Sequence, residues 1–294
     1  MKAKESFGRK CGTFLIFAGP AVISFVLVVI IPMIYGVYLT FTGWDGFTNA
    51  KPFVGLTNYI AVFQDGAFWN SLWLTVKYVA LSVVFINALA FALAYLLTSG
   101  IKGQNFLRAG FFTPNLIGGI VLGYIWQFIF SRVMVDLGNV ISLPIFAKSW
   151  LSSPGGAFAA LVIVTTWQYS GYMLLIYISG FVSVPTDLLE AARIDGANAS
   201  QLTRYIRMPM MVPAFVTCLF LSITRCFKVY DLNLSLTAGG PYDSTKLAAM
   251  HIYTQAFENH QYGLGQAEAL VLFLVMGIIA FIQISMGKSK EVEA

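Results

Sequence analysis

Charged residues are scarce in this sequence. Only 11% of its 294 residues are Asp, Glu, Lys or Arg, and 58% are hydrophobic, whereas an average soluble protein has about 25% charged residues. This deficit excludes an ordinary soluble domain and predicts an integral membrane protein. The net charge of +5 then reflects basic residues sorted to one side of a bilayer rather than affinity for nucleic acid.

Cysteine and histidine are rare as well. The three cysteines are Cys11, Cys218 and Cys226, and their odd number without a C-x-x-C spacing argues against a disulfide framework and against zinc. The two histidines, His251 and His260, form no H-E-x-x-H pattern, so we expect no metal on this chain.

The sequence also lacks the patterns of an enzyme. No Ser-His-Asp or paired-carboxylate arrangement lies on a recognisable scaffold, so we expect no catalytic residue. Gly287-Lys288-Ser289 resembles the end of a phosphate-binding loop, but Ile282 stands where G-x-x-x-x-G-K-[ST] requires glycine. The chain is therefore predicted to carry no cofactor, and energy for any work must come from another polypeptide.

Long hydrophobic runs are abundant instead. About 20 apolar residues cross the hydrocarbon core of a bilayer, and the runs predict an all-α membrane protein of six spans. These lie at about 13–39, 71–97, 109–130, 157–181, 210–228 and 265–286. One membrane domain, 13–286, would lie between short ends at 1–12 and 287–294, with bends at Pro20 and Pro32 in the first span.

The connection 41–70 is rich in Gly, Asp, Asn and aromatic residues. Aromatic side chains favour the headgroup region of a membrane, and this composition predicts an interfacial loop. The rings expected at the interface are those of Trp44, Phe53, Tyr59, Phe68 and Trp69.

The distribution of Lys and Arg predicts the orientation, because basic residues favour the cytoplasmic side. Eleven of the 18 lie at the two ends and in the connections 98–108 and 182–209, whereas the alternate connections hold four. Both ends and the segment 182–209 are therefore predicted to face the cytoplasm.

The segment 182–209 is polar enough to fold outside the membrane. Asp187 is a candidate N-cap, Glu190 follows three residues later as in a capping box, and Gly196 supplies a C-terminal stop. This pattern predicts one short helix.

A second short helix is expected to follow. Asn198 or Ser200 could cap it, and it should end before Pro209 because proline disfavours helical geometry in the preceding residue. Small side chains would let another backbone approach the pair closely; these are Ala191, Ala192, Gly196 and Ala197. The pair is either a surface element that closes a long loop or a docking element for a cytoplasmic partner.

These residues resemble a known family. Glu190-Ala-Ala-x-x-Asp195-Gly-Ala197, followed by Ile206-x-x-Pro209, is similar to the EAA loop of permease subunits of bacterial ABC importers. The resemblance implies that the helix pair seats in a cleft of an ATP-hydrolysing subunit. It implies docking through Asp187, Glu190, Ala191, Ala192, Asp195, Gly196, Ala197, Ile206 and Pro209, while Ser200 and Thr203 depart from the bulky aromatics common in the sugar-transporting branch.

Other stretches are similar to one branch of that family. Phe53-Val-Gly-Leu-x-Asn-Tyr59, the expected turn Leu137-Gly-Asn139, Val184-Pro-x-Asp-Leu188 and Leu236-Thr-x-Gly-Gly-Pro241 with Thr245 resemble the lactose-type or glycerol-phosphate-type first permeases of the maltose-transporter-like branch. The resemblance implies a bacterial inner membrane location and a heterodimer with a second permease. It also implies two ATPase subunits that bind ATP and Mg, an extracytoplasmic solute-binding protein and a sugar as substrate.

Polar and aromatic residues within the spans are candidates for the substrate pathway. A polar group in hydrocarbon is costly and faces a cavity or another helix, and a sugar site combines aromatic faces with a few placed polar groups. The candidates are Asn87, Trp126, Gln127, Trp167, Gln168, Tyr169, Arg225, Phe227, Tyr230 and Glu268. For these amides and for Gln283, a hydrogen bond between helices is the competing explanation.

Two other functions are compatible with six spans. An ion-coupled secondary transporter or channel would need no ATPase, but such proteins often carry ionisable groups at mid-span. Asp and Glu are absent from the middle of every predicted span, which counts against ion coupling. A membrane scaffold without transport activity is the third alternative.

Overall fold

The computed structural model describes residues 16–288, and in this range the regular secondary structure is helical apart from a single β-bridge between Thr42 and Phe53. The all-α prediction is confirmed for these residues. The predicted cytoplasmic end at 1–12 and most of the one at 287–294 lie outside the described residues.

The chain divides into two compact units, which we describe separately. The small unit comprises Met1–Asp65 and Ile252–Val271, and the large unit comprises Gly66–His251 and Leu272–Ala294.

The small unit is built around the first apolar run. The helices α2 (Gly19–Phe25) and α3 (Ile31–Leu39) are joined by the π-helical segment η1 (Val26–Ile30). This segment lies between Pro20 and Pro32, and a π-bulge is one way in which a helix adapts to a residue that cannot donate a backbone hydrogen bond. The unit also contains α4 (Thr57–Gln64), η7 (Thr254–Glu258) and the beginning of α16 (Tyr262–Lys288).

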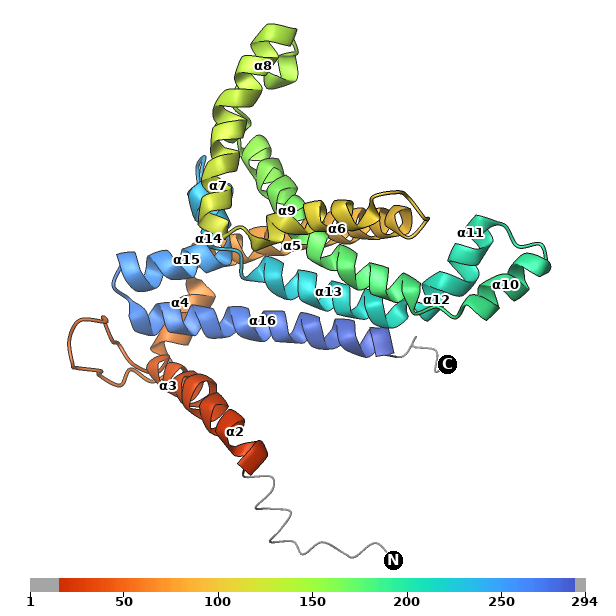
Figure 1. The fold of residues 1–294 in the computed structure, drawn as a ribbon. Coiled ribbons are helices and arrows are strands. Elements are labelled where there is room, and N and C mark those ends of the chain that lie inside the picture. The colour runs from red at the N-terminus through yellow and green to blue at the C-terminus, as the bar shows by residue number, and fades with distance from the viewer. Residues whose placement is uncertain (1–15, 289–294) are drawn as a thin grey trace, which may run out of the picture. The chain divides into compact units, whose positions relative to one another are not determined.

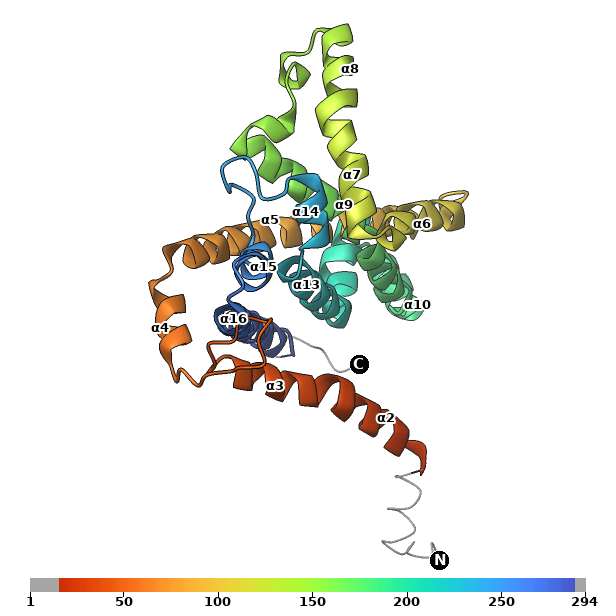
Figure 2. The same ribbon diagram turned by 90° about the vertical axis from the view of Figure 1, so that its left-hand side faces the viewer.

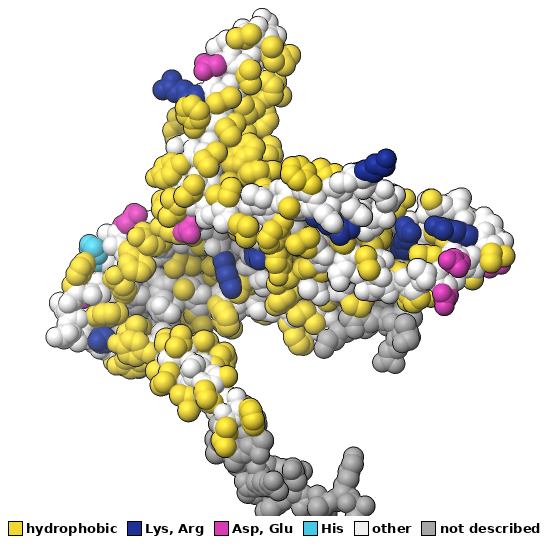
Figure 3. Space-filling view, viewed as in Figure 1, with side chains coloured by type: hydrophobic (Ala, Val, Ile, Leu, Met, Phe, Trp, Pro, Cys, Tyr) yellow, Lys and Arg dark blue, Asp and Glu magenta, His cyan; other side chains and the backbone are white. Residues whose placement is uncertain are grey.

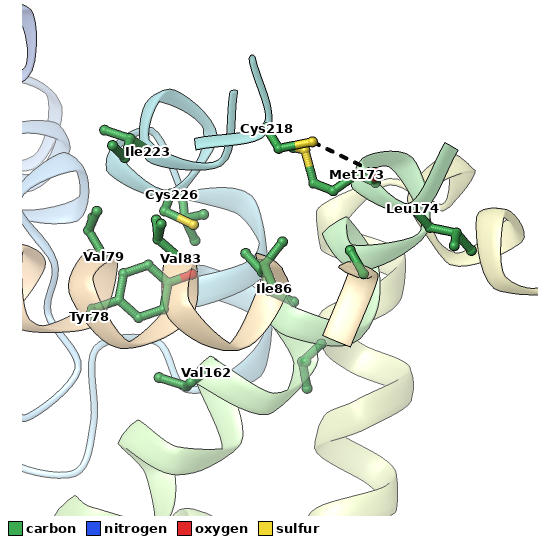
Figure 4. Packing of buried hydrophobic residues seen from close by; sticks show 14 of the residues in the cluster. Tyr78, Val79, Val83, Ile86, Val162, Met173, Leu174, Cys218, Ile223 and Cys226 are labelled. Atoms are coloured by element: carbon green, nitrogen blue, oxygen red, sulfur yellow. Dashed lines mark hydrogen bonds between the residues drawn. The ribbon is translucent and has the colours of Figure 1, made fainter. Parts of the chain in front are cut away.

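The large unit has a core of three helices that pack side by side (Figure 1). They are α5 (Gly66–Leu97), α9 (Pro154–Val182) and α13 (Val212–Phe227). Tyr78, Ile86 and Leu174 are among the fully buried side chains between them, and the Cys218 thiol lies 3.7 Å from the Met173 carbonyl oxygen (Figure 4).

Shorter helical segments connect the core helices. They are α6 (Gln104–Phe112), η2 (Thr113–Leu116), α7 (Gly119–Phe128), η3 (Ile129–Val133), α8 (Met134–Ile141), η4 (Pro144–Phe146), η5 (Trp150–Ser152), α10 (Thr186–Ile194), α11 (Ala199–Leu202), η6 (Thr203–Arg207), α12 (Met208–Met210) and α14 (Asp231–Leu236). The arm formed by α7 and α8 projects away from the core helices (Figure 2). The helix α15 (Ala248–Tyr253) lies at the boundary of the two units. Two glycines permit close helix contacts: a Cβ at Gly171 of α9 would meet the Phe111 carbonyl of α6, and one at Gly123 of α7 would meet Ser235 of α14.

Among residues 16–288, five helical runs are long and apolar enough to cross a membrane. They are Gly19–Leu39, Gly66–Leu97, Gly119–Ile141, Pro154–Val182 and Tyr262–Gly287. A sixth is obtained if Ala199–Met210 and Val212–Phe227, which meet at a bend of 69°, count as one span. The helix Val212–Phe227 alone has 16 residues, fewer than the about 20 that a bilayer requires.

The third span differs from its predicted position at 109–130. Pro114 lies in the 3-10 segment η2, which separates α6 from α7 and places the long apolar run at Gly119–Ile141. Leu137-Gly-Asn139 therefore lies within α8 and does not form the expected turn.

Candidate functional site

The helix α10 begins earlier than the sequence predicts. Its N-cap is Pro185, without a side-chain hydrogen bond, so Asp187 lies in the first turn and the predicted capping box with Glu190 does not form. A carboxylate in the first turn still interacts favourably with the helix dipole. The buried side chain of Val184 lies immediately before this start.

The end of α10 follows the prediction. Gly196 has φ of +86°, its N–H donates to the Arg193 carbonyl at 3.0 Å, and the N–H of Ala197 donates to the Ala192 carbonyl at 2.9 Å. This pair of bonds is a Schellman motif, in which the left-handed residue is usually glycine because other residues pay a steric penalty there.

The helix α11 has the capping box that α10 lacks. Asn198 Oδ1 accepts a hydrogen bond from the Gln201 N–H at 3.0 Å, and Gln201 Oε1 accepts one from the Asn198 N–H at 2.8 Å. Of the two predicted caps, Asn198 is therefore confirmed.

The prediction that this helix ends before Pro209 is wrong. The helical backbone continues through η6 into α12, which contains Pro209, and turns by 69° at Met211. The wider π-helical turn of η6 directly precedes the proline, and such turns accommodate a residue without a backbone donor.

The helix pair α10–α11 presents a largely exposed surface. Glu190, Ala191, Asp195 and Gly196 are exposed, and Ala192, Ala197, Ile206 and Pro209 are half-buried. Two large apolar side chains are also exposed, Ile194 at 87% and Tyr205 at 68%. A hollow of about 350 Å³ lies between the helices and is lined by Ala192, Asp195, Gly196, Ala197, Gln201, Tyr205 and Ile206.

Charged side chains gather over this pair, whereas hydrophobic ones dominate over α7 (Figure 3). On its inner side the pair is fixed to the rest of the large unit: Leu189 of α10 and Ile206 of the adjoining η6 pack against the hydrophobic core, and the Arg207 guanidinium of η6 lies 6.0 Å from the centre of the Phe181 ring. The pair is thus attached to α9 on one side and open on the other.

A second group of predicted residues meets around a small cavity. A volume of about 170 Å³ is lined by Gly119, Gln168, Tyr169, Lys228, Val229, Tyr230, Asp231 and Leu232. Three of the predicted pathway residues, Gln168, Tyr169 and Tyr230, are therefore brought together from α9 and the segment between α13 and α14. Gln168 is buried, and its Nε2 donates to the Ile117 carbonyl at 3.1 Å.

Arg225 lies beside this cavity. Its guanidinium carbon is 5.4 Å from the centre of the Tyr169 ring and 4.4 Å from that of Tyr172, and Nη1 donates to Asn115 Oδ1 at 2.7 Å. The cation thus links α13 to α9 and to η2. Two cation–π contacts and one hydrogen bond satisfy a charge that would otherwise be costly in this half-buried position.

The remaining predicted pathway residues lie elsewhere. Asn87 is held in a hydrogen-bond network within the core. Gln127 and Trp167 are exposed, and the centres of the Trp126 and Trp167 rings are 5.4 Å apart. Phe227 is buried in the core of the large unit, and Glu268 is buried in the small unit. Gln283 Nε2 donates to the Val216 carbonyl at 3.1 Å, as expected of a bond between helices.

Sequence reasoning missed four residues near the cavity, namely Asn115, Tyr172, Lys228 and Asp231. Tyr172 follows Tyr169 by three residues, and this helical spacing could have identified it. Asn115 gives no such signal, because its partner Arg225 is 110 positions away.

The comparison with known proteins identifies the family. Residues 86–287 match the family described as "Binding-protein-dependent transport system inner membrane component". The chain belongs to this family. The resemblance to permease subunits of ABC importers, inferred from the EAA-like pattern, is thereby confirmed.

Several relatives are similar over most of their length. The probable starch degradation products transport system permease protein AmyD of Thermoanaerobacterium thermosulfurigenes is 41% identical over 293 residues, covering 100% of both chains. The multiple sugar-binding transport system permease protein MsmF of Streptococcus mutans serotype c is 31% identical over 89% of this chain and 90% of its own. These relatives are transport permeases, in agreement with the prediction that the chain is a transport subunit.

A solved structure supports the fold. A bacterial alginate ABC transporter, in complex with an alginate-pentasaccharide-bound periplasmic protein, contains a chain that matches with a TM-score of 0.82. The match covers 97% of this chain and 98% of that one at 18% sequence identity. The ABC importer permease fold is therefore that of this chain as well.

Proposed function

We propose that this permease forms half of the translocation pathway of a binding-protein-dependent ABC importer for a carbohydrate. The substrate class is an oligosaccharide or a glycerol-phosphate-like polyol. The names of the relatives support this class, since they refer to starch degradation products, multiple sugars and, at 30% identity over 249 residues in Thermococcus litoralis, trehalose and maltose. A second permease, two ATPase subunits with ATP and Mg, and an extracytoplasmic solute-binding protein complete the transporter.

The single observation that carries the proposal is the exposed surface of α10–α11. The pair is held to the core through Leu189 and Ile206, while Glu190, Ala191 and Gly196 remain exposed. An ATPase subunit seated on this surface would move the pair when it binds and hydrolyses ATP. The excess of basic residues in the connections on this side supports a cytoplasmic position for the pair and for both chain ends.

The movement would reach the core through α12 and α13. Met211, at the 69° bend, is buried, and a Cβ added to Gly180 of α9 would lie 3.1 Å from its terminal methyl group. Because packed interiors transmit displacement rather than absorb it, α9 and α13 would shift together with the helix pair. If this shift closes the pathway on one side of the bacterial inner membrane and opens it on the other, the result is alternating access.

The polar cavity beside Arg225 is the proposed part of the pathway that contacts sugar. Tyr169 offers an aromatic face, and Gln168 and Asp231 offer polar groups in the lining. A volume of about 170 Å³ is below the range of about 300–1,000 Å³ typical of ligand pockets. The cavity therefore suits one portion of a carbohydrate, and the second permease would supply the rest of the site.

The docking role is tested with Glu190→Lys, which reverses the charge of an exposed side chain without changing the core. We expect the affinity for the ATPase subunits to fall by about tenfold or more, which corresponds to about 1.4 kcal/mol of binding free energy. ATPase subunits would then be lost from the purified complex, and sugar uptake would fall with them. Gly196→Asp should have the same effect, because φ of +86° disfavours a side chain at that position.

The matched control is Lys102→Glu, a charge reversal at another exposed position on the same predicted side of the membrane. It should leave ATPase association and uptake intact. If Glu190→Lys and Gly196→Asp behave like this control, α10–α11 is not the docking element.

A further inference from the structure

A stripe of large apolar side chains is exposed on α4 and on residues 53–56, which precede it. Phe53 is 75% exposed, Leu56 62%, Ile60 56% and Phe63 65%. Residues 56, 60 and 63 follow the i, i+4, i+7 spacing of a single helix face. The other side of α4 is packed, since Val62 is fully buried.

Hydrogen bonds fix α4 to the residues that follow the first apolar run. Asn58 Nδ2 donates to the carbonyl oxygens of Thr40 at 2.8 Å and Thr42 at 2.9 Å, and the Tyr59 hydroxyl lies 2.7 Å from Thr40 Oγ1. Because α3 ends at Leu39, these bonds hold α4 beside the end of the apolar run Gly19–Leu39.

The loop between α3 and α4 is polar and ordered. Asp45 Oδ1 accepts hydrogen bonds from the N–H groups of Phe47 and Thr48, both at 3.0 Å, and from the Thr48 hydroxyl at 2.9 Å. The backbone N–H of Thr48, then that of Phe47, hold the pKa of Asp45 below its usual value. Lys51 Nζ lies 4.9 Å from the centre of the Trp44 ring. The same unit thus presents a charged, folded loop beside an apolar helix face.

We propose that the stripe Phe53–Leu56–Ile60–Phe63 inserts into the lipid headgroup region, so that α4 lies in the plane of the membrane as an interfacial anchor. An apolar helix face beside the end of a span, flanked by a cation and aromatic rings, is the arrangement that interfacial helices favour. The partner of this surface is phospholipid, continuous with the lipid that surrounds the first span.

This assignment changes the set of interfacial residues expected from the sequence. Of the five aromatic residues predicted at the headgroups, Phe68 is fully buried and Tyr59 is half-buried against Thr40. Phe53 remains in the exposed stripe, and the other members of the stripe were not predicted. The helix face, rather than aromatic composition, determines which side chains reach the lipid.

The proposal is tested by spin labelling in the assembled transporter, reconstituted in vesicles of phosphatidylethanolamine and phosphatidylglycerol. A nitroxide is attached at Ile60→Cys or Leu56→Cys in a Cys11→Ser background, since Cys218 and Cys226 are buried. Asn49→Cys, in the exposed loop, is the aqueous control. Retained sugar uptake shows that each variant is folded.

We expect labels at positions 56 and 60 to collide several-fold more often with oxygen, which partitions into lipid, than with a water-soluble nickel chelate. The label at 49 should show the opposite preference. Nickel access at 56 and 60 equal to that at 49 would place the stripe in water and overturn the proposal. Protection from both reagents would show that a protein subunit covers the stripe, and this result would overturn it as well.

Discussion

At the scale of single residues, Asn87 shows how a polar group in an apolar span is satisfied. The Tyr177 hydroxyl donates to Asn87 Oδ1 at 2.8 Å, and Asn87 Nδ2 donates to Ser222 Oγ at 3.0 Å and to the Val83 carbonyl at 2.8 Å. One side chain of α5 thus binds α9 and α13. Its role is to hold the three core helices in register.

This role can be tested by a double-mutant cycle. Asn87→Leu and Tyr177→Phe should each lower the free energy of unfolding in detergent by about 1 kcal/mol, the size of a hydrogen bond between membrane helices. The double variant should lose less than the sum, because both changes remove the same bond. Tyr124→Phe, at a side chain 60% exposed, serves as the control without effect. Strictly additive losses would contradict the network.

The sequence could identify Asn87 as a residue that needs a partner, but not which partner. Tyr177 is 90 positions away and Ser222 is 135 positions away, and no local pattern encodes such pairs. For the same reason the sequence could not separate Gln168, which lines the cavity, from Phe227, which is buried in the core.

At the scale of elements, features that depend on near neighbours were predicted best. Gly196 ends α10 and Asn198 caps α11, as each residue's own chemistry requires. The path of the chain near Pro209 and the position of the third span were predicted wrongly. Near Pro209 a π-helical turn carries the helix through the proline, so the local rule that proline ends a helix fails there. At the third span the rule holds, because the 3-10 turn at Pro114 interrupts the run that was predicted as one helix.

The cap of α11 gives a prediction at this scale. Asn198→Ala removes the hydrogen bond that Asn198 Oδ1 accepts from the Gln201 N–H and leaves the backbone N–H of residue 198, which donates to Gln201 Oε1. The loss should lower the stability of α11 by about 1 kcal/mol, so that the amide of Gln201 exchanges its hydrogen about fivefold faster. Asn198→Asp keeps an acceptor at the cap, so the Gln201 amide should exchange its hydrogen at close to the original rate. Hydrogen exchange read by mass spectrometry distinguishes them, and equal rates in both variants would show that the cap does not stabilise α11.

At the scale of the whole molecule, the sequence and the fold indicate which part of a transporter this chain forms. The chain has long apolar helices, a packed three-helix core and an exposed helix pair, but no sequence that would form a phosphate-binding loop. We propose that a transporter built from it takes its energy from another subunit. Family membership and the fold show a transport permease, and the ATPase subunits are the partners that we propose for α10–α11.

The most direct test of this account is sugar uptake by reconstituted vesicles. The account predicts uptake only when the second permease, the ATPase subunits, the solute-binding protein and ATP are all present, and loss of uptake in the Glu190→Lys complex. Uptake by the purified chain alone, driven by an ion gradient without ATP, would contradict it and identify an ion-coupled transporter instead.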